Sequence, residues 1–165
     1  MARIVDLNVT TYYWVPGDTG IADVNAPTAV EITAGENISQ YVVTSTSVMP
    51  AASETVNERS VTDTANVVVP TIGNYEGTLV LFRDFTSGAA TADDLLATFT
   101  GRPVGFIVRR VGKPASTAVA ASDVVDVFKF MADNPQTQGG TGEGYLKLTV
   151  PLLQQGVFAV GVDVA

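Results

Sequence analysis

The chain has 165 residues, the size of one ordinary domain with a single hydrophobic core. It contains neither histidine nor cysteine, which excludes Ser-His-Asp and Cys-His catalysis and zinc sites built from these residues. Nine basic residues against 17 acidic ones give a net charge of −8. A negatively charged protein repels nucleic-acid phosphates, which disfavours tight nucleic-acid binding.

The composition predicts a mainly β protein. Val, Thr and Ile total 52 residues, and β-branched side chains fit strands better than helices. Only 16% of residues are charged, so we expect neighbours to cover much of the surface. No apolar run approaches the roughly 18 residues that span a bilayer, and the start lacks a signal peptide's apolar region. We therefore expect a chain made and kept soluble in a cytoplasm, with no membrane contact.

Short alternating segments separated by turn residues predict nine strands, a spacing typical of a sandwich or barrel. They cover residues 3–10, 29–32, 38–44, 65–69, 76–84, 104–111, 124–131, 144–151 and 157–164.

Three aromatic residues, Tyr12, Tyr13 and Trp14, follow the first predicted strand. We interpret them as an anchor that fixes an N-terminal arm to the body of the protein or to a neighbour. The alternative is a carbohydrate-stacking surface.

The segment 45–60 is predicted to be a long loop, because Ser, Thr, Ala, Pro and Glu alternate there with little apolar periodicity. Loops of this length are usually functional or become ordered against a partner. Val48, Met49 and Glu54 are therefore candidate contact residues. Arg59 and Asp63, four residues apart, could pair with each other or with another copy.

One short helix is predicted over 91–99. Thr91 is suited to cap it, Asp93 and Asp94 favour its positive end, and its apolar stripe includes Leu95 and Phe99. Gly101 is expected to end the helix. Helix capping explains both aspartates, so no acid–base or Mg²⁺ pair is inferred.

Arg109 and Arg110 form the basic doublet of the chain. Neighbours on a strand point to opposite faces, so only one of them can face a given partner. A salt bridge, within the domain or across a subunit contact, explains them better than phosphate binding does. Both remain candidate contact residues.

The segment 133–144 is a glycine-rich loop that includes Glu143, another candidate contact residue. It is not a phosphate loop, because no Lys-Ser or Lys-Thr follows its last glycine and the next residues alternate like a strand. We interpret it as a hairpin connection. The sequence therefore predicts no catalytic, cofactor-binding or metal-binding residues.

Residues 55–85 read TVNERSVTDTANVVVPTIGNYEGTLVLFRDF. This stretch resembles the major tail proteins, or tail tube proteins, of long-tailed siphovirus-like bacteriophages, particularly those of actinobacterial hosts. The order of elements is also similar: a loop with Arg and Asp, a GNYEG turn into a strand, a short helix, and the strand over 104–111.

The resemblance implies a tail-tube-type β-sandwich or barrel with one short flanking helix. It also implies self-assembly into hexameric rings stacked into a tube, through which DNA leaves the capsid without sequence-specific binding. The implied partners are the tape measure, tail terminator and baseplate or tip proteins, and the implied location is the virion tail, assembled in the host cytoplasm. We expect a single tube domain over 1–165, without a C-terminal immunoglobulin-like domain.

The acidic balance suits this function, because a lumen that passes DNA should repel phosphates. Segment 45–60 is our candidate for the main stacking loop between rings.

Two alternative functions stay open. One is another self-assembling phage β protein, such as a head-decoration or head–tail connector component. The other is a β-sandwich carbohydrate-binding module.

Overall fold

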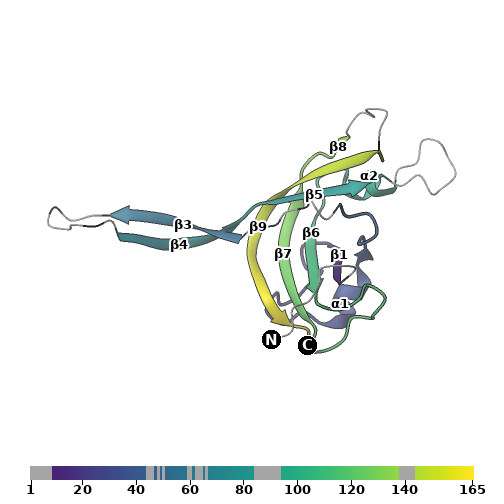
Figure 1. The fold of residues 1–165 in the computed structure, drawn as a ribbon, viewed down its shortest axis with the longest axis horizontal. Coiled ribbons are helices and arrows are strands. Elements are labelled where there is room, and N and C mark those ends of the chain that lie inside the picture. The colour runs from purple at the N-terminus through teal and green to yellow at the C-terminus, as the bar shows by residue number, and fades with distance from the viewer. Residues whose placement is uncertain are drawn as a thin grey trace.

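The computed structural model describes residues 9–43, 47, 49, 51–58, 61, 65, 67–83, 94–137 and 144–165. A curled sheet forms the body, and a two-stranded arm projects from it (Figure 1). The elements, in chain order, are β1 (Thr10–Pro16), α1 (Ala29–Ala34), β2 (Glu36–Asn37), β3 (Ala51–Glu58), β4 (Val67–Tyr75), β5 (Gly77–Phe82), α2 (Asp94–Phe99), β6 (Val104–Val111), β7 (Val124–Ala132), β8 (Gln136–Thr137) and β9 (Lys147–Asp163).

The sheet of the body is antiparallel, with the strand order β2-β1-β6-β7-β9-β5, and β8 pairs with β9. The segment 36–43 reaches both ends of this sheet. At one end, β2 pairs with β1 and the Ile38 amide donates to the Tyr12 carbonyl (3.0 Å). At the other end, the Val43 amide donates to the Val80 carbonyl of β5 (2.8 Å). The segment thus forms hydrogen bonds with backbone N–H and C=O groups at the sheet edges. Left unpaired, these groups could pair with a strand of another chain.

Both faces of the sheet are buried near its middle, because successive side chains of a strand point to opposite faces. On one face Trp14, Ile107 and Phe128 join a core that also contains Leu95 and Phe99 of α2. On the opposite face Tyr13, Phe106 and Val127 join a second core with Ile32 of α1. The helices thus cover different faces of one sheet.

The mainly β fold with short helices is confirmed, and strands β5, β6 and β7 lie where the alternation predicts strands. The predicted strands at 144–151 and 157–164 are parts of one continuous strand, β9. Irregular register near Gly156, whose φ is +137°, lets this strand bend without breaking. The helix predicted over 91–99 is α2. Residues 91–93, including the predicted cap, lie outside the described residues, and Gly101 follows with a φ of +87°.

Two predicted strands are wrong. Residues 29–32 belong to α1, whose capping box joins Thr28 to Glu31 through bonds of 3.2 and 2.8 Å. Residues 38–43 form turns and one isolated bridge, from Val42 to Leu81, while the short strand β2 precedes them.

Four other predicted segments change. The first described strand is β1, whereas residues 3–8 of the predicted strand lie outside the described residues. The prediction at 65–69 covers only the start of β4. The predicted loop 45–60 is wrong over 51–58, which form β3, and the predicted loop 133–144 contains β8. In β3 and β8, strands pair through their backbones although their sequences lack alternating apolar residues.

Candidate assembly surfaces

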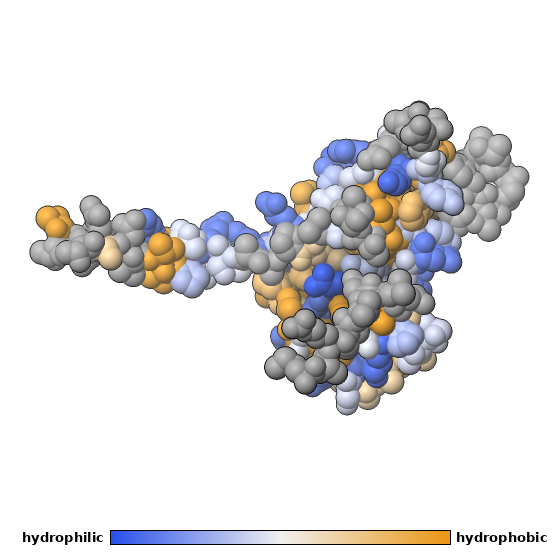
Figure 2. Space-filling model, in the orientation of Figure 1, coloured by the Kyte–Doolittle hydropathy of each residue, from blue (hydrophilic) through white to orange (hydrophobic). Residues whose placement is uncertain are grey.

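The arm, defined here as strands β3 and β4, stands away from the body (Figure 1). Its strands pair with each other, and every side chain described over 53–57 and 68–73 is exposed. Val56, Val68, Val69 and Ile72 are 43%, 55%, 53% and 63% exposed. Apolar side chains are accordingly visible along the arm in Figure 2. An isolated two-stranded hairpin is marginally stable in water, so a surface of this kind is suited to burial against a partner.

The base of the arm is fixed to the body by Tyr75, the last residue of β4. Its ring lies 4.9–5.5 Å from the rings of Phe128, Phe130 and Phe158. Its hydroxyl donates to the Lys129 carbonyl, and burial raises the pKa of this hydroxyl. The buried aromatic cluster therefore sets where the arm leaves the sheet.

At the base of the arm, the backbone of Gly77 also packs closely against the ring of Phe130. A Cβ atom there would lie 2.6 Å from the Phe130 ring and 2.9 Å from Leu152, so a larger residue would displace the start of β5.

Strand β9 has an open edge beyond its pairing with β5. The β5 ladder ends at Gly77 opposite Leu152, whereas β9 continues to Asp163 along β7. No strand of the described ranges pairs with the other edge of 153–163. Leu153, Val157 and Val160 are also exposed there. An open edge with apolar side chains is a template for pairing with another chain.

A third surface lies where β5 ends and β9 begins. Tyr145 is 82% exposed, its ring packs edge-on against Phe82 at 5.5 Å, and the neighbouring Leu146 is exposed too. Lys147 lies directly opposite Phe82 in the ladder. Five other basic side chains within the described part of the chain form ion pairs, whereas Lys147 forms none there.

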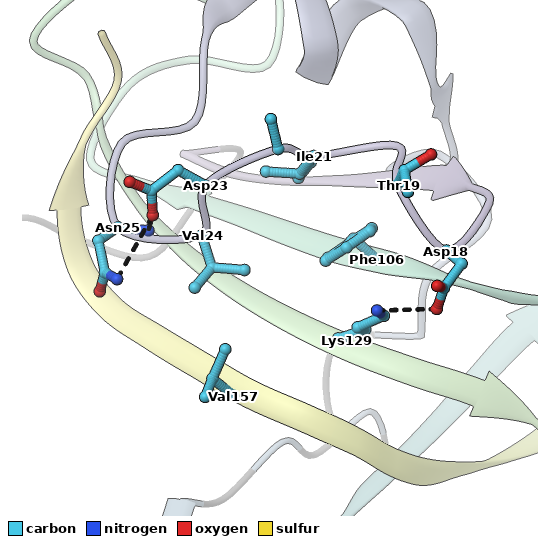
Figure 3. Close-up of a pocket in the computed structure, with 10 residues that line it drawn as sticks. Asp18, Thr19, Ile21, Asp23, Val24, Asn25, Phe106, Lys129 and Val157 are labelled. Atoms are coloured by element: carbon cyan, nitrogen blue, oxygen red, sulfur yellow. Dashed lines mark hydrogen bonds and ion pairs between the residues drawn. The ribbon is translucent and has the colours of Figure 1, made fainter.

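A pocket of about 310 Å³ lies between the loop 17–25 and the sheet (Figure 3). Phe106 and Val157 contribute apolar walls. Lys129 enters it from β7, but its ammonium group pairs with the Asp18 carboxylate at 2.8 Å and lies 5.5 Å from the Phe106 ring centre. The cation of this pocket is therefore already neutralised by the chain itself, which disfavours an anionic ligand.

The described residues contain no cluster of three metal-ligating side chains. Their helices are also too short to cross a membrane. The described surface offers an arm, an open strand edge and apolar patches, which are features of assembly.

Comparison with known proteins agrees with this. The family model for phage tail tube proteins matches residues 1–165. The chain belongs to the phage tail tube protein family. It is therefore a structural component of the phage tail, and its resemblance to tail tube proteins is confirmed.

Among solved structures, the fold is similar to a chain in the cryo-EM structure of the anti-feeding prophage baseplate, symmetrised six-fold. The TM-score is 0.59 at 17% sequence identity, with 98% of this chain and 99% of that chain covered. This match shows that the two chains share a fold. No curated protein sequence matches the chain.

The aromatic residues singled out in the sequence are part of the core of this tail tube subunit. Tyr12 and Trp14 enter one core and Tyr13 the other, and all three are buried within β1. Their burial does not support a sugar-stacking surface. Met49 is buried as well, against the first core.

The two arginines form ion pairs inside the chain. The Arg109 guanidinium donates twice to Asp126 Oδ2, at 2.9 and 2.7 Å, whereas Arg110 pairs with Asp123 at 3.1 Å on the opposite face. The opposite orientations are as predicted for neighbours on a strand. Of the two alternatives for the salt bridges, the one within the domain is observed.

Of the other candidate contacts, Glu54 is exposed on the arm, and its carboxylate accepts from the Asn74 side chain at 2.9 Å. Val48, Arg59, Asp63 and Glu143 lie outside the described residues. Sequence reasoning missed the open edge of β9, the exposed pair of Tyr145 and Leu146, and the apolar residues of β4. The run of three valines at 67–69, followed by Ile72, was a signal for the last of these.

Proposed function

We propose that copies of this chain join edge to edge into rings, six copies to a ring, and that the rings stack into the tail tube. The tube conducts genomic DNA from the capsid to the host. Support comes first from the family and second from the arm, whose exposed apolar side chains need a partner of similar extent. The open edge of β9 supports lateral joining, because pairing around a closed ring leaves no strand edge unsatisfied.

In this proposal the segment 45–60, which includes β3, makes the main contact between rings. The arm projects beyond the body, so it can reach a copy that does not lie directly beside it. The siphovirus-like type, the tape measure, terminator and tip partners, and assembly in the host cytoplasm belong to the same proposal.

The charge of the subunit supports the conduction of DNA. The chain carries a net charge of −8, and the described basic residues Arg109, Arg110 and Lys129 are each paired with an aspartate. Unpaired phosphate-binding cations along the bore would retain DNA, and an acidic wall repels it.

Negative-stain electron microscopy beside size-exclusion chromatography tests the assembly. Concentrated protein should form hollow tubes or stacked rings of uniform diameter, with six-fold end views. A monodisperse monomer under every condition, including after seeding with fragments of purified tails, would overturn the proposal.

A further inference from the structure

The arm leaves the sheet where the ladder between β5 and β9 ends. The last pair of this ladder is Gly77 with Leu152. Continuing the antiparallel register by two residues would place Tyr75 opposite Gln154, but in the described part of the chain the ladder stops before this position. Instead, the amide of Tyr75 donates to the side-chain oxygen of Gln154, at 3.1 Å. A side chain thus takes the place of the next backbone acceptor.

The side chain of Gln154 also binds two carbonyl groups. Its nitrogen Nε2 donates to the carbonyl of Gly156 at 3.0 Å and to the carbonyl of Gly73 at 3.4 Å. Gly73 belongs to β4, and Gly156 lies at the bend of β9. A side-chain amide has an acceptor oxygen and two donor hydrogens, so it is suited to joining one N–H group and two carbonyls. One side chain therefore links the start of the arm to the bend of β9.

A ring contact gives a second link at the same place. Phe158, which follows the bend, has its ring centre 5.1 Å from that of Tyr75. A Cβ atom at Gly73 would lie 3.2 Å from the Phe158 ring, so the backbone of β4 passes close to it. Links at both Gly73 and Tyr75 fix a direction, because a strand held at one point can still rotate about that point. The side chains described farther along the arm are exposed, so they do not add to this support.

We infer that Gln154 is the positioning residue that holds the arm at one direction relative to the body. Its effect on assembly rests on the proposed tube. The bend at Gly156 lies within the open edge of β9, so Gln154 holds the arm and this edge in one geometry before copies meet. An arm whose direction is already fixed loses less freedom when it docks. Gln154 therefore lowers the concentration at which tubes grow.

Spin-label distances in the unassembled subunit test the inference. The chain has no cysteine, so Val69→Cys on the arm can be combined with Val30→Cys or Val111→Cys on the body, and all three valines are exposed. Double electron–electron resonance should give one narrow distance distribution for each pair. Gln154→Met keeps an unbranched side chain but removes the amide, so both distributions should broaden while the urea midpoint changes little. The matched control is Gln155→Met, the same substitution at the exposed neighbour, which should leave both distributions unchanged.

Two further measurements follow the bond and its consequence. Hydrogen exchange of the Tyr75 amide, measured by NMR, should become about tenfold faster in Gln154→Met, because the amide loses its acceptor. The critical concentration for tube growth should rise by about tenfold in the same variant and stay at the wild-type value in Gln155→Met.

Several results would overturn the inference. These are a broad distance distribution in the wild type, unchanged distributions in Gln154→Met, or equal broadening in Gln154→Met and Gln155→Met. Broadened distributions with unchanged tube growth would overturn the effect on assembly. Wild-type protein that gives narrow distributions but forms no tubes would instead overturn the proposed function, and the positioning role of Gln154 would stand.

Discussion

Arg110 is the residue around which the segment 112–123 is organised. It is 1% exposed, and its guanidinium donates to the carbonyls of Pro114, Thr117 and Ala118 as well as to Asp123. One buried cation therefore satisfies three backbone acceptors of a segment that has no strand or helix of its own. Such a group is costly to remove, because it leaves its buried partners unsatisfied.

Replacing Arg110 should destabilise the subunit strongly. We expect Arg110→Met to lower the free energy of unfolding by about 3–5 kcal/mol, because Asp123 stays buried without this partner. Arg102→Ala is the control, since its ion pair with Asp133 is largely exposed, and we expect a loss of at most about 1 kcal/mol. Urea unfolding of the unassembled protein measures both. Equal losses would contradict a special role for the buried cation.

Asp123 should make stability fall in acid. Burial raises the pKa of its carboxyl, but hydrogen bonds from Lys113, the Ala120 amide and Arg110 outweigh burial, and the pKa lies below its ordinary value. A pKa lowered by folding stabilises the fold above the unfolded value of about 4, and this contribution is lost as pH falls below it.

The comparison is between wild type and Asp123→Asn, by urea unfolding from pH 7 to pH 3. The variant should be less stable at pH 7 and should lose less stability on acidification. An identical pH dependence in both proteins would show that other carboxyls, such as the capping Glu31, dominate the acid response.

At the scale of elements, the junction between arm and body depends on Tyr75. We expect Tyr75→Ala to cost about 3–5 kcal/mol, because its ring packs among three phenylalanines, and Tyr75→Phe to cost about 1 kcal/mol for the lost hydroxyl bond. Tyr145→Ala is the matched control at an exposed ring, with a change within about 0.5 kcal/mol. Urea midpoints measure all three. A control as damaging as Tyr75→Ala would contradict the anchoring role.

The sequence predicts those elements whose environment lies within the subunit. Strand β6 is predicted at its observed bounds, because its alternation faces cores that the chain itself supplies. Strand β1 was not predicted beyond Thr10, because both of its faces are buried and its aromatic run shows no alternation. Helix α1 was mistaken for a strand. Its capping pair, Thr28 and Glu31, was a signal in the sequence, and Ile32 alone carries its buried face.

The arm is different, because no core within the described residues covers its side chains. In β3 the residues resemble those of a loop, since both faces meet solvent in the isolated chain and no core imposes a period. The segment stays a candidate contact, and it was not predicted to contain a strand. Tyr145 and the open edge of β9 were missed for the same reason, because the described part of the chain leaves both exposed.

At the scale of the whole molecule, the residues that stabilise the subunit differ from the residues that are exposed and available for assembly. Its two cores lie on opposite faces of one curled sheet, and the segment 36–43 covers parts of both sheet ends. The remaining apolar surface is carried mainly by the arm and by β9. A change on the arm can therefore alter tube growth without unfolding the body.

Net charge opposes this assembly, and salt should relieve the opposition. Each copy carries −8, so copies that approach one another repel through solvent. Raising sodium chloride from about 10 mM to about 150 mM shortens the screening length from about 30 Å to about 8 Å, whereas apolar burial on the arm is little affected. The critical concentration for tube growth, measured by light scattering and checked by electron microscopy, should therefore fall as salt rises. Weaker growth at the higher salt would show that attractive ion pairs between copies, such as one from Lys147, outweigh the repulsion between whole subunits.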